Sequence, residues 1–135
     1  MRRYLLDSNA LNLFVFRRSG VYDRSVEARR GGATIGTAIP VVAELLGGTL
    51  FSASSGVNLP RVTRGIRLLR VSPFDMPAAL EYARPYATLR PVGVEMQAID
   101  LMIAAVAMTL SDCTVVTSDG DFRRVPGLRV ADWAG

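Results

Sequence analysis

The sequence contains no histidine, and this absence excludes several kinds of site at once. A histidine general base, a Ser-His-Asp triad and a metal site with imidazole ligands all need that side chain. Cys113 is the only cysteine, so no intramolecular disulfide can form. It precedes an apolar segment, and we expect it to be a small buried hydrophobic residue. Any bound metal must therefore have oxygen ligands, which hard cations such as Mg²⁺ or Mn²⁺ prefer.

Lysine is absent as well, because all sixteen basic residues are arginine. The formal net charge is +4 and the isoelectric point is about 10.0. A basic surface attracts polyanions, so RNA or DNA is the first partner class to consider. An acidic protein partner would fit equally well, and a GC-rich genome would explain the arginine excess about as well as RNA binding does.

Long apolar runs are also missing. No uninterrupted stretch approaches the ~18 residues of a transmembrane helix, and the first ten residues lack the apolar segment of a signal peptide. We therefore expect a cytoplasmic protein that does not enter a membrane. With 135 residues, half of them hydrophobic, the chain fits one domain over residues 1–135 with one core.

Apolar strand-like and helix-like segments alternate along the chain. Strands are predicted at residues 4–6, 34–39, 68–71, 114–117 and 128–130. Helices are predicted at residues 10–16, 21–30, from Pro40 onward, 61–69, 77–89 and 94–110. Residues 7–9 are all good N-cap types for the first helix. This alternation predicts an α/β fold with a mostly parallel sheet of about five strands flanked by helices.

Three acidic residues follow predicted strands. Asp7 ends the first strand, Glu44 lies in the helix after the second, and Asp119 follows residues 114–117. Ligands bind outside the carboxyl ends of parallel strands, where strand order reverses. Any one of these acids alone would more often be a cap or a solvated loop residue. Their combination at one edge favours a shared site.

Asp100 has the most unusual surroundings of the acids. It is the one charged residue in an apolar segment, residues 98–108, with Gln97 as its one polar neighbour. An unpaired buried carboxylate would cost several kcal/mol or become neutral. A divalent cation shared with the other carboxylates would remove this cost. Alternatively, Asp100 occupies a polar strip of the helix and meets Gln97 or solvent.

Clustered carboxylates repel one another and need a counter-charge. A metal ion held by carboxylates and water can supply that charge and activate the water for attack on a phosphodiester. Two metals could stabilise both the attacking and the leaving oxygen, or one metal could work with a carboxylate base. The residues leave both schemes open.

Several segments carry a family resemblance. They are LLDSN (5–9), VAELLG (42–47), MQAIDLMIAA (96–105), VVTSDGDF (115–122) and VPGLRV (125–130), followed by Asp132-Trp133. Each motif is weak alone, but together, in this order, they resemble the PIN-domain ribonucleases, and among them the VapC toxins of toxin–antitoxin pairs. The resemblance runs from residue 4 to residue 133, nearly the whole chain.

The resemblance implies a three-layer PIN-like fold and Mg²⁺- or Mn²⁺-dependent cleavage of RNA. It implies that Asp7 and Asp100 are the principal metal ligands, with Glu44 and Asp119 completing the catalytic, metal-binding pocket. It also implies a homodimer and inhibition by a small VapB-like antitoxin. No RNA-binding residues are assigned, because each group of arginines along the chain fits a solvated face as well as it fits a contact with RNA.

Four neighbouring residues are expected to support the metal ligands, namely Ser8, Asn9, Thr117 and Asp121. Ser8 offers a hydroxyl that can bond a ligand carboxylate, and Asn9 supports a ligand or caps the first helix. Thr117-Ser118 stands where many family members have Thr-Asn, which leaves the role of Ser118 open. Asp121 either faces the pocket or caps the turn before Phe122, and the cap is favoured. Phe122 and Trp133 are expected to close the core.

Two other classes of protein were weighed. Receiver domains and haloacid-dehalogenase-type phosphatases also place aspartates at strand ends, but they rely on a lysine, and this chain has none. A catalytically quiet PIN-like module that binds protein or RNA is the second reading. Such modules typically lose one or more of the acids, whereas all four positions are acidic here.

Overall fold

A computed structural model describes residues 1–134. The strands are β1 (Arg3–Leu6), β2 (Thr34–Ala38), β3 (Arg70–Ser72), β4 (Cys113–Val116) and β5 (Arg129–Ala131). The α-helices are α1 (Ser8–Val15), α2 (Val21–Arg30), α3 (Ile39–Phe51), α4 (Ser55–Arg67), α5 (Met76–Leu89) and α6 (Ala98–Thr109). Two 3₁₀ turns, η1 (Arg90–Val92) and η2 (Gly120–Arg124), complete the elements of the described chain.

The five strands form one sheet in the order β3-β2-β1-β4-β5, and every neighbouring pair is parallel. Successive strands step outward from β1 through β2 to β3, and the chain then crosses to β4 on the other side of β1. The strand order therefore reverses at β1 and β4, where a parallel sheet offers a crevice at its carboxyl edge. The predicted α/β class and the number of strands are confirmed.

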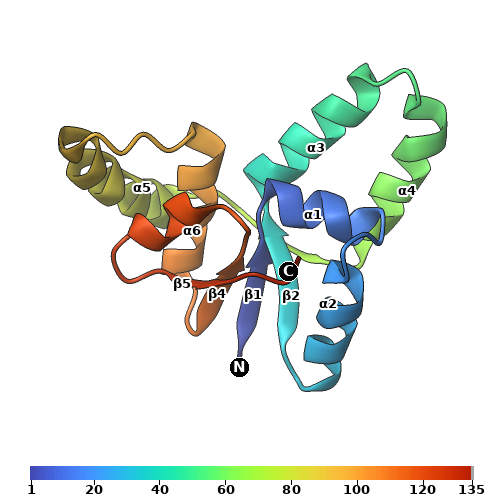
Figure 1. Cartoon of the computed structure of the whole chain (residues 1–135), viewed down its shortest axis with the longest axis horizontal. Coiled ribbons are helices and arrows are strands. Elements are labelled where there is room, and N and C mark those ends of the chain that lie inside the picture. Colours follow the sequence, from blue (N-terminus) through green and yellow to red (C-terminus); the bar gives the residue numbers. More distant parts are fainter. Residues whose placement is uncertain (135) are drawn as a thin grey trace.

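Helices cover both sides of the sheet, which gives the three-layer arrangement (Figure 1). Helices α5 and α6 lie on one side of the strands, and α1 and α2 lie on the other (Figure 1). Helices α3 and α4 contact each other and extend beyond the carboxyl ends of the strands (Figure 1). The starts of α1, α3 and α6 thus surround the same sheet edge.

Two predicted helix boundaries were wrong. Helix α6 begins at Ala98 rather than at residue 94, because Gly93 takes a left-handed conformation (φ 83°) and Gln97 remains extended. Helix α4 begins at Ser55 rather than at residue 61, and it continues through Pro60. Proline lacks the N–H of one helical hydrogen bond, so the sequence suggested a boundary where the helix in fact persists.

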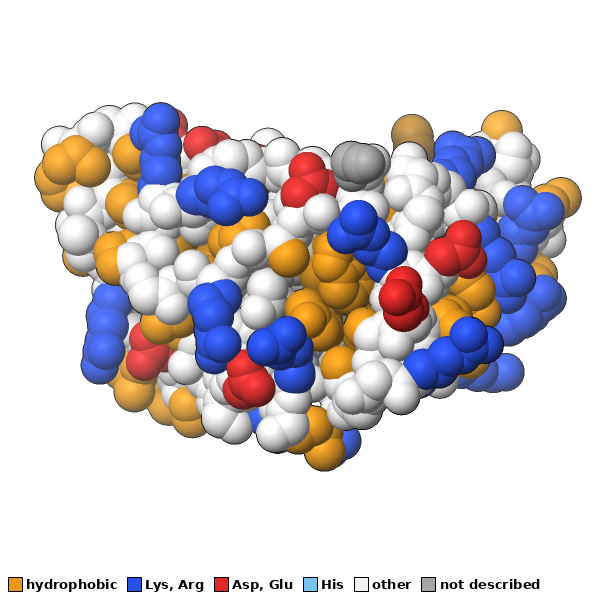
Figure 2. Space-filling view, turned by 60° about the horizontal axis from the view of Figure 1, so that its bottom comes forward, with side chains coloured by type: hydrophobic (Ala, Val, Ile, Leu, Met, Phe, Trp, Pro, Cys, Tyr) orange, Lys and Arg blue, Asp and Glu red, His pale blue; other side chains and the backbone are white. Residues whose placement is uncertain are grey.

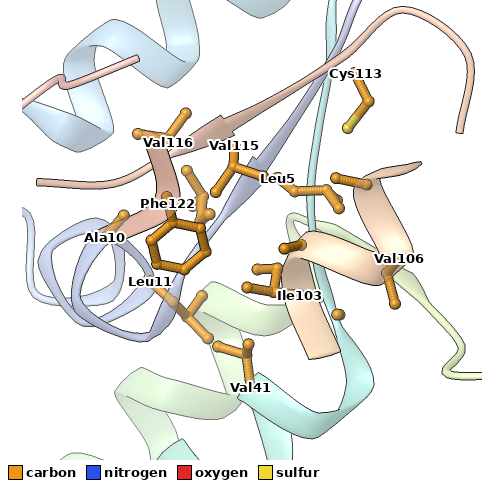
Figure 3. Close-up of a cluster of buried hydrophobic side chains, with 14 of the residues drawn as sticks. Leu5, Ala10, Leu11, Val41, Ile103, Val106, Cys113, Val115, Val116 and Phe122 are labelled. Atoms are coloured by element: carbon orange, nitrogen blue, oxygen red, sulfur yellow. The ribbon is translucent and has the colours of Figure 1, made fainter. Parts of the chain in front are cut away.

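The hydrophobic core lies between the sheet and its helices. Leu5 of β1 and Val115 and Val116 of β4 form a buried cluster with Leu11 of α1 and Ile103 of α6 (Figure 3). Phe122, from η2, is fully buried in this cluster, as predicted. Trp133 packs against the core with its ring 4.8 Å from that of Tyr4. Cys113 is buried, which confirms its interpretation as a hydrophobic residue.

No helix within residues 1–134 is both long and apolar enough to span a bilayer.

Candidate active site

Asp7 lies at the junction of β1 and α1 and is 4% exposed. It is the N-cap of α1, and its carboxylate accepts a hydrogen bond from the Ala10 N–H at 2.8 Å. Of the three predicted N-cap candidates, residues 7–9, the structure selects this one. Burial raises the pKa of Asp7, while hydrogen bonds from Thr117 and Ala10 oppose that rise. The fold thus holds a nearly dehydrated carboxyl group at the sheet edge.

Thr117 joins Asp7 to Asp119. The last pair in register between β1 and β4 is Leu6 with Val116, so Asp7 and Thr117 follow side by side. The buried Thr117 hydroxyl hydrogen-bonds the carboxylate of Asp7 and accepts the Asp119 N–H at 3.0 Å. A hydroxyl can donate one bond and accept others at the same time. Thr117 therefore links Asp7 and Asp119 by hydrogen bonds, and its support of a metal ligand stays a prediction.

Asp119 is the N-cap of η2, and its carboxylate accepts the Asp121 N–H at 2.9 Å. The expectation that Asp121 caps this turn was wrong, because the cap lies two residues earlier. Asp121 is half-buried instead, and its charge is one of those that raise the pKa of Asp100. Its charge therefore acts on Asp100 through space, and a pocket-facing role for Asp121 stays a prediction.

Asp100 occupies the first turn of α6 and is half-buried. Its pKa is raised to about 6, first by burial and then by the charges of Asp7, Asp119, Glu44 and Asp121. The sequence suggested a more enclosed carboxylate, but the later start of α6 places Asp100 near the open end of the helix. These charges thus lie near enough to Asp100 to act on it, although no three of the acids in residues 1–134 are close enough together to hold one ion by themselves. These five residues are called the acidic cluster below.

Glu44 completes the acidic cluster from the side of α3. It lies in the second turn of that helix and is exposed. With Ser8 it lines a hollow of about 320 Å³ between α1, α3 and α4. Ser8 is thus beside the acids, as expected. Asn9 is not the helix cap, but its backbone N–H donates to the carboxylate of Asp7.

The acidic cluster has no arginine partner within the described chain. The ion pairs among residues 1–134 are Arg84–Glu81 and Arg129–Asp112, and neither involves the cluster. No three acidic or cysteine side chains in this part of the chain approach closely enough to hold one ion by themselves. Mg²⁺ usually binds through one or two carboxylates and keeps several waters. The all-oxygen donors, their repulsion and the missing counter-charge fit such a cation.

The sequence reasoning missed two polar residues that hold the edge of the site. The fully buried Thr37 hydroxyl of β2 donates to the Leu6 carbonyl at 2.7 Å, directly before Asp7. Ser118 donates to the carboxylate of Asp132 at 2.9 Å, which ties the loop after β4 to the chain beyond β5. A threonine in an otherwise apolar or small-residue strand was the one available signal for Thr37.

Comparison with known proteins identifies the architecture. A family model described as the PIN domain matches residues 4–128. Comparison with curated proteins found no match.

Solved structures cover nearly the whole chain. DNA-bound VapBC from Salmonella typhimurium is 27% identical over 98% of this chain and 99% of that one, with a TM-score of 0.88. FitAcB from Neisseria gonorrhoeae is 26% identical over 96% of both chains, with a TM-score of 0.75. VapBC-5 from Mycobacterium tuberculosis, a member of the VapBC family of toxin–antitoxin systems, is 30% identical over 73% of this chain and 79% of that one, with a TM-score of 0.60.

Proposed function

Because this chain belongs to the PIN-domain family, we propose that it is a Mg²⁺- or Mn²⁺-dependent ribonuclease and the toxin of a VapBC-type toxin–antitoxin pair. The observation that carries the proposal is the acidic cluster at the point where strand order reverses. Its carboxylates repel one another and lack an arginine partner within residues 1–134. Such a cluster is suited to a divalent cation and unsuited to a bare phosphate.

Asp7 and Asp100 would hold the metal, with Glu44 and Asp119 at its margin. When bound, the ion would lower the pKa of a water and neutralise charge on the scissile phosphate. Thr117 keeps Asp7 oriented and ionisable by hydrogen bonding to its carboxylate. Glu44 is exposed and free of ion pairs in the described chain, so it can accept a proton or position a water.

The partners follow from the family and from the similar structures. We infer a small VapB-like antitoxin, because the compared structures include VapBC and FitAcB assemblies. We further infer a homodimer that acts on RNA in the cytoplasm. Exposed apolar side chains at the far end of the α3–α4 pair, Leu50, Phe51 and Val57, support burial against a second chain.

Cleavage of RNA by the purified protein tests this function. Wild type should cleave RNA with Mg²⁺ or Mn²⁺ and lose activity in EDTA. Asp7→Asn and Asp100→Asn should each reduce cleavage by at least about 100-fold, since the loss of a residue supporting a ligand already costs 10–100-fold. Asn is as good an N-cap as Asp, so Asp7→Asn leaves the start of α1 intact.

The matched control is Asp23→Asn, which removes an exposed acid on α2 and should leave cleavage unchanged. Calorimetric titration with Mn²⁺ gives a second readout, in which the two site variants bind more weakly than the control. Activity that survives EDTA, or equal activity in all variants, would overturn the proposal. A protein that binds RNA without cleaving it would instead be the quiet binding module.

A further inference from the structure

A second hollow, of about 370 Å³, lies at the far end of α1 from the acidic cluster. Its walls come from the C-terminal end of α1, the start of α2 and the middle of α4. Arg17, Arg61 and Arg64 line it together with the rings of Tyr22 and Phe16. These five residues are called the arginine hollow. Figure 2 shows arginine side chains gathered on the right of the view, the side where Figure 1 places α2 and α4.

Close helix packing forms the floor of the hollow. A Cβ atom on Gly65 would lie 2.8 Å from Cγ2 of Val15, nearer than side chains tolerate. The missing side chain therefore lets α4 approach the end of α1. That approach brings Arg61 and Arg64 opposite Arg17 across the opening.

Arg17 is held in an unusual position. Its φ of 54° is left-handed, a conformation that residues other than glycine rarely adopt. Its guanidinium carbon lies 4.2 Å from the centre of the Tyr22 ring, and its Nη2 lies 3.4 Å from the Tyr22 hydroxyl. A guanidinium stacked on a ring keeps edge N–H groups for an anion.

The charge of the hollow is not neutralised within the protein. None of the three arginines forms an ion pair with an acid of the described chain. Their guanidiniums suit phosphate oxygens, and the aromatic rings offer faces on which a base can stack. The hollow therefore presents the two kinds of contact that a single-stranded nucleic acid uses.

Its position connects it to the acidic cluster. The hollow lined by Ser8 and Glu44 also touches Phe16, so the two hollows meet at this ring. Helix α1, which separates Asp7 from Arg17, has eight residues, or about 12 Å at the helical rise. That length corresponds to roughly three to four nucleotides of a stacked strand. An RNA strand lying along α1 would reach both ends of the helix.

We propose that the arginine hollow binds the RNA substrate a few nucleotides from the scissile bond. The inference rests on the proposed ribonuclease function, because an acidic site needs cationic contacts elsewhere to retain a polyanion. An acidic peptide could contact the same arginines, but the continuity with the acidic cluster favours RNA. The hollow supplies affinity, and the acidic cluster supplies the chemistry.

The test measures binding of a short fluorescein-labelled single-stranded RNA by anisotropy, in EDTA and over a range of salt concentrations. Arg61→Gln combined with Arg64→Gln should weaken binding about tenfold. It should also lower the salt slope by about 1.4, because each lost phosphate contact accounts for about 0.7. The control is Arg30→Gln combined with Arg67→Gln, which removes the same charge outside the hollow. It should weaken binding by less than about threefold.

Equal weakening in the two double variants would overturn the inference. So would unchanged RNA affinity with lost binding of an acidic peptide. Because binding is measured in EDTA, the result does not depend on cleavage. If the protein cleaves RNA with metal but the two double variants lose RNA affinity equally, the role of the arginine hollow is contradicted and the ribonuclease function is not. If only the variant of Arg61 and Arg64 loses RNA affinity and the protein never cleaves RNA, the ribonuclease function is contradicted and the role of the hollow is not.

Cleavage gives a further readout. With a long RNA, the variant of Arg61 and Arg64 should raise KM and leave kcat unchanged. With a dinucleotide substrate, which is too short to span α1, it should match the control. A lower kcat on both substrates would contradict a binding role.

Discussion

At the N-terminal end of α1, Asp7 is almost fully buried and bonded to backbone and side-chain groups, whereas at the C-terminal end Arg17 is exposed and stacked on one ring. The acids are fixed by the sheet, because β1 and β4 place Asp7 and Thr117 in register. The arginines are placed by a helix contact at Gly65. The difference is that burial and mutual repulsion act on the carboxylates around Asp7, while the three arginines of the hollow are exposed to solvent.

We expect the largest effect on cleavage from a change beside Asp7, at the N-terminal end of α1. Thr117→Val removes the hydroxyl that bonds both Asp7 and Asp119 but keeps the side-chain volume. We expect cleavage to fall by about 10- to 100-fold and Mn²⁺ affinity to fall with it, since the metal ligands lose their support. RNA affinity in EDTA should stay unchanged.

Thr114→Val is the matched control, because it makes the same change in β4, three residues from Thr117. It should leave cleavage intact. A variant of Thr117 with full activity would show that the acids need no such support.

We expect the next largest effect at the contact of α4 with the C-terminal end of α1, beneath the arginine hollow. Gly65→Ala pushes a methyl group against Val15, and we expect a loss of about 1 to 2 kcal/mol in the free energy of unfolding. It should also weaken RNA binding by spreading the walls of the arginine hollow. Gly56→Ala, in the same helix with open space around it, should be neutral or stabilising by up to about 1 kcal/mol.

Urea melts of the two glycine variants measure this difference. Equal stability would mean that α1 and α4 are not in close contact. If the Gly65 variant is destabilised but binds RNA normally, RNA binding does not depend on the close contact of α1 with α4.

The smallest effect concerns the charge of Asp100. Its pKa of about 6 lies above the ordinary 3.8, so the folded protein binds this proton more tightly than the unfolded chain does. Its contribution to stability is therefore complete below pH 3.8 and is lost as the pH rises through 6. The shift corresponds to at most about 3 kcal/mol, and solvent screening of the half-exposed group reduces this to about 1 kcal/mol.

Asp100→Asn should thus stabilise the metal-free protein by about 1 kcal/mol at pH 8 and leave it unchanged near pH 4. Urea melts in EDTA at the two pH values measure this. Asp23→Asn should show no such dependence. Mn²⁺ should stabilise wild type more than Asp100→Asn, and the opposite order would contradict a ligand role for Asp100.

Much of the fold could be read from the chain. Segments of β-branched and apolar residues marked the strands, and α2 was predicted at its observed bounds, residues 21–30. The boundaries of α4 and α6 were missed because one proline is tolerated inside a helix and because residues 94–97, after the left-handed Gly93, are not helical. The local sequence pattern does not show where tertiary packing makes a helix begin.

For the site, the four acids were recognised from their positions and from motif resemblance, since carboxylates after strands are visible in a sequence. Thr37 was not, because its hydrogen bond to the neighbouring strand depends on register. The cap at Asp119 was not, because it depends on the residue at which the short turn η2 begins. The arginine hollow was visible as scattered arginines only. Arg17 is far along the chain from Arg61 and Arg64 of α4, and the contact of α1 with α4 makes the three neighbours.

The sequence by itself determined the chemistry that this protein can perform. Without histidine or lysine, and with one buried cysteine, carboxylates are the side chains left to ligate a metal or to accept a proton near neutral pH, and the proposed hard cation suits such oxygen ligands. Only the tertiary structure decided how close the charges are. The pKa of Asp100 and the meeting of three arginines depend on distance and burial, and distance and burial are set by packing between segments that the chain separates.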